Sequence, residues 1–170
     1  QALLTKKIDT VVALLEPFSP PEPTVAPSET TGYRLRAEFK MWHDGDDINY
    51  VMFRPENPST PISITEFPIA DKLIQHLMPV LRDALLVDYT LRRKLFQVEF
   101  LASLSGNLLV SLIYHRKLDD AWEKAADDLA TGLRRHIPSI SVIGRKQKQK
   151  FVLGADFIQE VLTIHGEQYR

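Results

Sequence analysis

The sequence predicts an α+β fold in which helices pack on one side of a mainly antiparallel sheet. Segments with alternating apolar and polar residues come in pairs joined by short turns, which is typical of antiparallel hairpins. Segments with apolar residues three or four positions apart follow these pairs and indicate helices. With 170 residues and 44% hydrophobic residues, the chain can form one domain with a substantial core.

Residues 1–16 are expected to form an amphipathic helix ahead of the body of the domain. Its apolar residues recur at helical spacing: Leu4, Ile8, Val11, Val12 and Leu15. Residues 17–32 hold five prolines among small polar residues, which favours an extended linker that straps the helix to the body. We therefore expect a single domain composed of this helix, the proline-rich linker and an α+β body over residues 33–170.

The body should begin with a hairpin followed by a third strand and a helix. Residues 33–42 alternate between apolar odd positions and charged or aromatic even positions, as a half-buried strand does. The Asp-Gly of "HDGDD" predicts the turn into a second strand over 48–53. A third strand is expected over 62–67, after the proline-rich "RPENPSTP". Apolar residues from Leu73 to Leu85 then predict a helix that Pro79 kinks or breaks.

The second half repeats this outline. Residues 95–104 and 108–115 are expected to be strands joined at "SGN". An apolar stripe from Leu118 to Leu133 predicts a helix, and Asp120 with Glu123 resembles a capping box at its start. A further strand is expected over 139–144, and the pattern of residues 151–162 is less distinct.

The composition excludes several functions. Lys and Arg total 21 against 22 Asp and Glu, so the net charge of −1 gives no general attraction to a polyanion. The absence of cysteine excludes disulfides, iron–sulfur ligation and a cysteine nucleophile within these residues. No apolar run approaches the roughly 18 residues of a membrane span, and lysines interrupt the first apolar segment, unlike a signal peptide. We expect a cytoplasmic protein, and the lack of an initial methionine suggests that residues precede Gln1.

Two patterns raise the question of metal or nucleotide chemistry. His43, Asp44, Asp46 and Asp47 could form the metal site of a hydrolase, but a tight turn needs the same residue types and is the favoured interpretation. Glycines follow strands in "VIGRKQKQK" and "VLGADF", yet neither segment has the spacing of a phosphate-binding loop. We expect neither a metal nor an S-adenosylmethionine site within this chain.

Basic residues cluster beside aromatic ones, as in proteins that bind unpaired RNA. Phosphates require positive charge, and unstacked bases require flat surfaces. Each cluster alone is more often a solvated face, so the hypothesis depends on whether the clusters share one surface. The clusters are Arg34, Arg36 and Lys40 with Trp42; Arg92, Arg93 and Lys94 before Phe96; Tyr114 and His115 before Arg116 and Lys117; and Arg145, Lys146, Lys148 and Lys150.

At "YRLRAEFKMWHDGDD", "LRRKLFQVEF", "SLIYHRKLDDAW" and "VIGRKQKQK" the sequence resembles the N-terminal part of the bacterial tRNA (uracil-5-)-methyltransferase family. The resemblance covers essentially the whole chain. It implies an RNA-binding α/β region, followed in the same polypeptide by a C-terminal methyltransferase domain that binds S-adenosylmethionine. The family modifies the T-loop uridine of tRNA through a cysteine nucleophile and an assisting glutamate. These groups would lie outside this chain, which alone should be inactive. Related ribosomal-RNA enzymes carry an iron–sulfur cluster, which this cysteine-free chain cannot ligate.

The resemblance also implies three residues that contact the T-arm of tRNA: Lys40, where the family can carry arginine, Phe96, which would stack on or wedge between bases, and His115. Charge placement adds Arg34, Arg36, Arg93, Arg116 and Arg145 to the predicted RNA-binding residues. Phe96 alternates with Val98 and Phe100, and without the resemblance we would assign all three to the core. The resemblance reverses that assignment.

Another class of function remains open from the sequence. The chain could be a non-catalytic protein-interaction or regulatory α+β module, in which the first helix and the proline-rich linker bind a partner. That hypothesis predicts that Arg34, Lys40, Phe96 and His115 scatter over different faces. The RNA-binding hypothesis predicts that they gather on one face.

Overall fold

The computed structural model describes residues 2–170, which divide into a short N-terminal unit up to Thr30 and a body from Thr31 to Arg170. The N-terminal unit contains helix α1 (Ala2–Leu15) and the 3-10 helix η1 (Glu16–Phe18). No residue of α1 is buried. The expected N-terminal helix is therefore present, with its apolar side chains exposed. Among residues 2–170, no helix is both long and apolar enough to cross a lipid bilayer.

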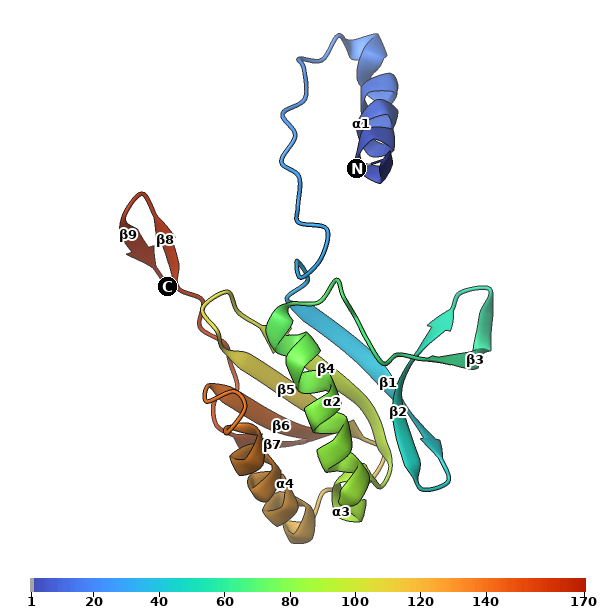
Figure 1. The fold of residues 1–170 in the computed structure, drawn as a ribbon, viewed down its shortest axis with the longest axis vertical. Helices are drawn as coiled ribbons and strands as arrows, with labels where there is room; N and C mark the ends of the chain where they lie inside the picture. The colour runs from blue at the N-terminus through green and yellow to red at the C-terminus, as the bar shows by residue number, and fades with distance from the viewer. Residues whose placement is uncertain (1) are drawn as a thin grey trace. The chain divides into compact units, whose positions relative to one another are not determined.

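The body is built on a seven-stranded sheet with the strand order β3-β2-β1-β4-β5-β6-β7 (Figure 1). Neighbouring strands are antiparallel except β5 and β6, which are parallel and are connected through helix α4. The strands are β1 (Arg36–Asp44), β2 (Asp47–Arg54), β3 (Asn57–Ser63), β4 (Leu95–Ala102), β5 (Leu108–Tyr114), β6 (Ile140–Lys146) and β7 (Gln149–Leu153). This arrangement confirms the predicted α+β class with a mainly antiparallel sheet.

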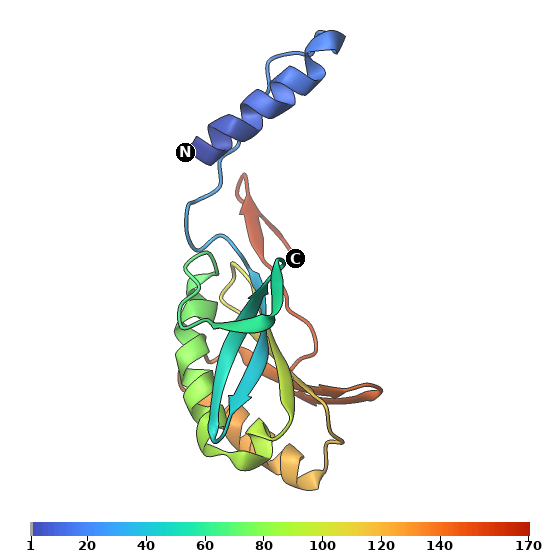
Figure 2. The same cartoon turned by 90° about the vertical axis from the view of Figure 1, so that its right-hand side faces the viewer.

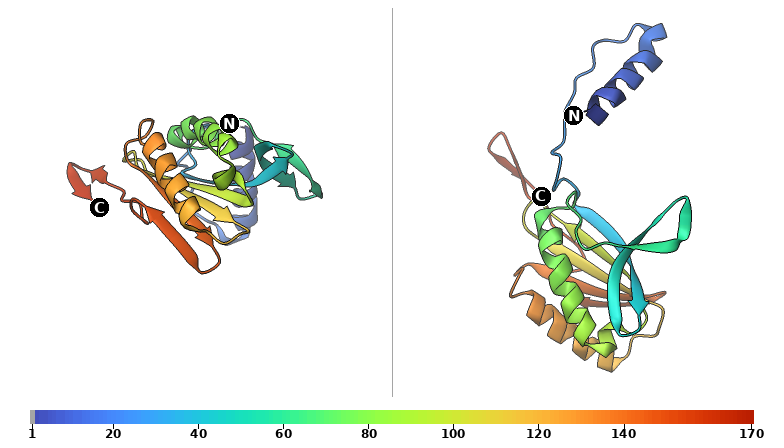
Figure 3. Two further views of the ribbon diagram at one scale, coloured as in Figure 1. Left: turned by 90° about the horizontal axis from the view of Figure 1, so that it is seen from below. Right: turned by 45° about the vertical axis from the view of Figure 1, so that its right-hand side comes forward.

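Helices α2 (Lys72–Val87), α3 (Tyr89–Arg92) and α4 (Asp120–Leu133) lie on one face of the sheet (Figure 3, left). In β1 the odd residues from Ala37 to Met41 are buried beneath these helices, whereas the even residues from Arg36 to Trp42 point away from them. Within residues 31–170 no helix covers that second face, which we call the open face (Figure 2). The main core therefore lies between the helices and one side of the sheet, while Val51 and Ile143 are buried on the other side.

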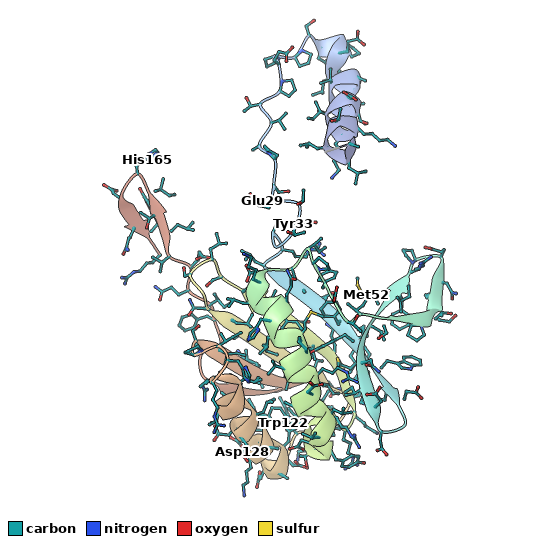
Figure 4. All side chains as sticks on the ribbon, viewed as in Figure 1. Glu29, Tyr33, Met52, Trp122, Asp128 and His165 are labelled. Carbon is teal, nitrogen blue, oxygen red and sulfur yellow. The ribbon has the colours of Figure 1, made fainter. Side chains whose placement is uncertain are left out.

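Trp122 fills the core between α4 and the sheet (Figure 4). Its ring is fully buried and contacts the rings of Tyr114 and Phe151 at centroid distances of 5.6 and 5.7 Å. Opposite it lies Gly144 of β6, where an added Cβ would be 2.0 Å from the indole ring. The absence of a side chain at Gly144 is thus what makes room for the indole ring.

Three local predictions need correction. Strand β3 begins at Asn57, earlier than expected, and includes Pro58 and Pro61. Both prolines are tolerated because β3 is the edge strand and need not donate hydrogen bonds on its outer side. Helix α2 continues through Pro79 without a break. Proline has no N–H, so the backbone carbonyl four residues earlier loses its hydrogen-bond donor. Because Pro79 is exposed, water can bind that carbonyl instead.

The N-cap of α4 is Asp119, one residue before the predicted Asp120. Its side chain accepts a hydrogen bond from the backbone N–H of Trp122 at 3.0 Å, because an N-cap bonds the third residue of the helix. The spacing from Asp120 to Glu123 therefore does not form the expected capping box.

The last residues form a small hairpin of β8 (Leu162–Ile164) and β9 (Glu167–Tyr169), which was not predicted and which projects from the sheet (Figure 1). The segment before it is fixed by Glu160, whose carboxylate accepts hydrogen bonds from the backbone N–H groups of Leu104 and Ser105 at 2.8 and 2.9 Å. This contact joins the end of the chain to the turn between β4 and β5.

Candidate nucleic-acid interface

A β-bulge determines the direction of the Phe96 side chain. Leu95 pairs with Tyr114 and Gln97 pairs with Ile113, so Phe96 is one extra residue on β4. Leu95 is buried in the core, and Gln97 pairs with Lys40 on the open face. Phe96 is only partly buried, although Val98 and Phe100 are fully buried. The bulge therefore separates Phe96 from the core pattern to which simple alternation assigns it.

Phe96 lies between two predicted RNA-binding residues. The Nζ atom of Lys40 is 3.8 Å from the centroid of the Phe96 ring. The His115 ring is stacked on Phe96 with centroids 3.9 Å apart and an interplanar angle of 21°. Lys40 belongs to β1 and His115 follows β5, the two neighbours of β4, so they approach the ring from opposite sides. We call Lys40, Phe96 and His115 the Phe96 stack.

A chain of hydrogen bonds holds the Lys40 ammonium in place. Lys40 Nζ donates to Gln97 Oε1 at 2.6 Å, and Gln97 Nε2 donates to Glu99 Oε1 at 2.8 Å. Sequence reasoning missed Gln97 and Glu99, because neither is a cation or an aromatic residue. Only their position beside Lys40 identifies them, and that position is known only from the register of β1 against β4.

The stack borders a surface hollow of about 320 Å³ at the beginning of β4, lined also by Met41, His43 and Lys94. His43 Nε2 is hydrogen-bonded to the carbonyl oxygen of Leu95 at 2.8 Å. Lys94 has a φ of 54°, a left-handed conformation that is unusual for a residue with a side chain. Its carbonyl oxygen accepts a hydrogen bond from the His115 backbone N–H at 2.9 Å, which joins the two strands next to the stack.

Arg36 and Arg145 also lie on the open face. They line a common hollow of about 260 Å³ with Lys150, although β1 and β6 are not adjacent. Arg36 forms an exposed ion pair with Glu38 at 3.4 Å. Lys150, which pairs with Arg145 across β6 and β7, forms an ion pair with Asp156 at 2.7 Å.

Arg34 precedes β1 and is exposed. With Arg36 it lines a second hollow of about 480 Å³, in which Met52 and Phe67 provide apolar surface. Met52 lies at the base of the β2–β3 hairpin (Figure 4). Arg34 and Arg36 therefore both border a hollow whose lining is partly apolar.

Arg93 and Arg116 do not line the hollows that Arg34, Arg36 and Arg145 line. Arg93 is the C-cap residue after α3 and is exposed, and its carbonyl oxygen accepts a hydrogen bond from Arg116 Nε at 3.2 Å. The Arg116 guanidinium also donates to the carbonyl oxygen of Thr90 at 2.7 Å and lies 3.6 Å from Asp119. Only 11% of the Arg116 side chain is exposed. Arg116 thus stabilises the backbone around α3, and little of its charge reaches the surface.

The acidic "HDGDD" turn is neutralised by arginines from the helical side. Arg92 binds Asp46 at 2.8 Å, and Arg82 binds Asp47 at 2.7 Å. The pKa of Asp47 is lowered, chiefly by a hydrogen bond from the side chain of Asn49 and also by Arg82. Residues 2–170 contain no group of three His, Asp or Glu side chains arranged to hold a metal ion. These contacts are those of a structural turn.

Gly144 lies within β6 and Gly154 follows β7, and other side chains fill the space beside both glycines. The ring of Trp122 fills the space at Gly144, and Ser141 Oγ would be 2.6 Å from a Cβ added at Gly154. These residues do not form the backbone cradle that a nucleotide or S-adenosylmethionine requires.

The whole chain, residues 1–170, matches the family model described as tRNA (Uracil-5-)-methyltransferase. A protein of Aromatoleum aromaticum named tRNA/tmRNA (uracil-C(5))-methyltransferase is 50% identical, over 98% of this chain and 45% of that protein. Proteins of the same name from Chromohalobacter salexigens and Edwardsiella ictaluri are 47% and 45% identical, over 99% and 97% of this chain and 45% of each protein. The chain thus spans a little less than half the length of these curated relatives.

Proposed function

The chain belongs to the tRNA (uracil-5-)-methyltransferase family, and we propose that it is the RNA-recognising part of an S-adenosylmethionine-dependent enzyme that methylates C5 of the T-loop uridine of tRNA. The names of the relatives support this activity. Because those relatives are about twice as long, the proposal assigns the methyl donor and the nucleophile to a C-terminal domain of the same polypeptide. The place of action is then the cytoplasm.

The Phe96 stack is the observation that carries this proposal. It brings the ammonium of Lys40 and the imidazole of His115 each within 4 Å of the centre of the Phe96 phenyl ring. RNA loops are recognised by this combination, because the cation attracts phosphate while the rings accept unstacked bases. A protein-interaction surface would instead require a larger apolar patch with few charges at its centre.

The geometry indicates how a base would enter. Both faces of the Phe96 ring are already covered, one by Lys40 and the other by His115. The His115 side chain is exposed, so a base can stack on its outer face without rearrangement. Direct stacking on Phe96 requires Lys40 to leave the ring, and a phosphate group is the natural new partner for its ammonium. RNA binding would then exchange a contact within the protein for two contacts with the nucleotide.

A uridine inside a folded T-loop is inaccessible to a nucleophile until it leaves its stack. The proposed role of the Phe96 stack is to stabilise the opened loop while the uridine is delivered to the catalytic domain. The chain itself has no cysteine and should not catalyse methyl transfer alone. Arg34, Arg36 and Arg145 are proposed to hold the phosphates that flank the loop, and Arg93 adds an exposed charge. For Arg116 we propose a positioning role for α3 instead of direct contact.

Binding of a T-arm RNA hairpin to the 170-residue chain, measured by fluorescence anisotropy at low salt, tests the proposal. Phe96→Ala and His115→Ala should each weaken binding by about tenfold or more, as expected for the loss of one stacking contact. Phe157→Ala is the matched control, because Phe157 is also exposed but lies outside the stack. Unchanged affinity in both stack variants would refute the site, and failure of the chain to bind the hairpin would refute the function.

We also propose that α1 packs on the C-terminal domain of the same polypeptide. Its apolar side chains are exposed, with Leu3 and Leu14 at 77% and 72%. An isolated helix of 14 residues is marginal in water and normally gains its stability from packing. The relatives contain additional chain that could supply such a surface.

A further inference from the structure

Trp42 is a large exposed aromatic residue on the open face, two positions after Lys40 in β1. Its side chain is 44% exposed, although tryptophan is normally well buried. Within residues 2–170 its ring has no aromatic or cationic partner, and its indole N–H has no hydrogen-bond acceptor. Nothing in the fold described above accounts for this exposure.

The surroundings of Trp42 are rigid. Trp42 pairs with Asn49 on β2. The Asn49 side chain is held on both sides, because it donates to Asp47 at 2.9 Å and accepts from Arg82 at 3.1 Å. The residue opposite Trp42 is therefore fixed by hydrogen bonds, which limits the rearrangement of this surface when a ligand binds.

Two of the three carboxylates in the nearby acidic turn are neutralised by ion pairs. Asp47 is paired with Arg82 and Asp46 with Arg92, and both arginines approach from the helical side. Lys40 and Asp44 are the nearest charges on the same face of β1, each roughly 7 Å away as alternate residues of a strand are, and Lys40 is the cation of the two. An unpaired nucleotide whose phosphate binds Lys40 therefore has its base within reach of the Trp42 ring.

We infer that Trp42 is a second base-stacking platform, which holds an unpaired nucleobase next to the one at the Phe96 stack. The inference rests on the proposed RNA-binding function. A nucleobase is favoured over a protein partner, because Trp42 stands alone among charged neighbours such as Glu38, Lys40 and Asp44. The centre of a protein interface is depleted in charge, whereas sites for unpaired RNA combine single aromatic residues with cations.

Tryptophan fluorescence of the 170-residue chain tests this inference directly. The chain contains two tryptophans, and Trp122 is completely buried. Iodide quenching in the free protein should therefore report Trp42. A T-arm hairpin should quench the exposed emission and protect it from iodide. A blunt RNA duplex of equal length should not, because its bases are already stacked.

Two variants make the test quantitative. Trp42→Leu keeps an apolar side chain but removes the ring, and should weaken hairpin binding by about tenfold. Trp42→Phe keeps a ring and should lose clearly less affinity for the hairpin than Trp42→Leu does. The buried emission of Trp122 confirms that each variant is folded.

The outcomes separate this inference from the proposed function. Hairpin binding that depends on Phe96 but is unchanged in Trp42→Leu would overturn the inference, leave the proposed function intact and indicate a protein contact for Trp42. Failure of the unmodified chain to bind the hairpin would overturn both.

Discussion

The two faces of the seven-stranded sheet are formed by alternate residues of the same strands, yet they differ in what holds their side chains. On the covered face, Phe39 and Phe100 are almost fully buried and contact each other's rings, and Tyr114 contacts Trp122 of α4. On the open face, Lys40 and Phe96 are only partly buried, and His115 is exposed. Their contacts are to one another and to the hydrogen-bonded Gln97. The covered face determines stability, and the open face is available for binding.

The difference shows that a dense cluster of charge in the sequence is not by itself a binding site. The acidic turn at residues 43–47 is satisfied by Arg82 and Arg92 and belongs with the structural side of the molecule. Phe96 lies at the centre of the candidate site, although the exposed Arg93 beside it in the sequence does not join the Phe96 stack. The two faces should therefore respond differently to substitution.

The largest effect is expected at Gly144 on the covered face. In Gly144→Ala the new Cβ would lie 2.0 Å from the ring of Trp122. Overpacking of this kind should lower the free energy of unfolding by about 3 kcal/mol, measured by urea denaturation. Gly132→Ala is the control, since a Cβ at this position of α4 meets nothing within 4 Å and should stabilise the helix by about 0.5–1 kcal/mol. Equal urea midpoints for Gly144→Ala and Gly132→Ala would show that the indole ring of Trp122 leaves room for a side chain at Gly144.

Arg82→Ala should have the next largest effect and should again act on stability. Arg82 Nε donates to the carbonyl oxygen of Ile48 at 3.0 Å, and Nη2 donates to Asp47 at 2.7 Å. Loss of these bonds should cost about 1–2 kcal/mol in the free energy of unfolding. Asp83→Ala removes only an exposed ion pair of Arg82 and should cost less than about 0.5 kcal/mol. If hairpin affinity fell in Arg82→Ala while stability held, the turn would belong to the binding surface.

On the open face, Lys40→Gln should change RNA binding more than stability. If Lys40 contacts one phosphate, the slope of log affinity against log salt concentration should fall by about one. The matched control is Lys124→Gln, because Lys124 is exposed on α4 on the covered side. Equal slopes of log affinity against log salt concentration for Lys40→Gln and the unmodified chain would show that Lys40 does not contact a phosphate.

The smallest effect concerns the end of the chain and depends on pH. A hydrogen bond from the Ser105 hydroxyl is the main cause that lowers the pKa of Glu160 below its ordinary value of 4.5. Because the folded pKa is lowered, the contact stabilises the fold fully above pH 4.5 and is lost as the pH falls through the lower folded value. NMR titration of the Leu104 and Ser105 amides should show a midpoint below 4.5 that disappears in Glu160→Gln. A midpoint at or above 4.5 would contradict this account.

Local patterns predicted much of the fold because they reflect burial. The apolar stripe from Leu118 to Leu133 gave α4, and Asp-Gly gave the turn between β1 and β2. The extent of β3 was not predictable, because its tolerance of Pro58 and Pro61 depends on an edge position that only the assembled sheet defines.

The candidate site was predictable only through the resemblance. Alternation places Phe96 with Val98, and only the pairing of β4 with β5 reveals the extra residue. The sequence also gives no indication that Arg116 is enclosed by backbone carbonyls whereas Arg145 reaches the open face. Both distinctions depend on contacts between distant segments. The convergence of Lys40, Phe96 and His115 was a hypothesis from the sequence that required coordinates to test.

The bulge at Phe96 makes the position of the aromatic ring sensitive to the number of residues in β4. Removal of a single residue, for instance Gln97, would restore the simple alternation and move Phe96 to the open-face position that Gln97 now holds opposite Lys40 and Ile113. The strand would remain equally hydrophobic, and its hydrogen bonds to β1 and β5 could re-form one position along. A one-codon deletion would thus remove the bulge and the amide that holds the Lys40 ammonium, while every apolar side chain of the strand is kept.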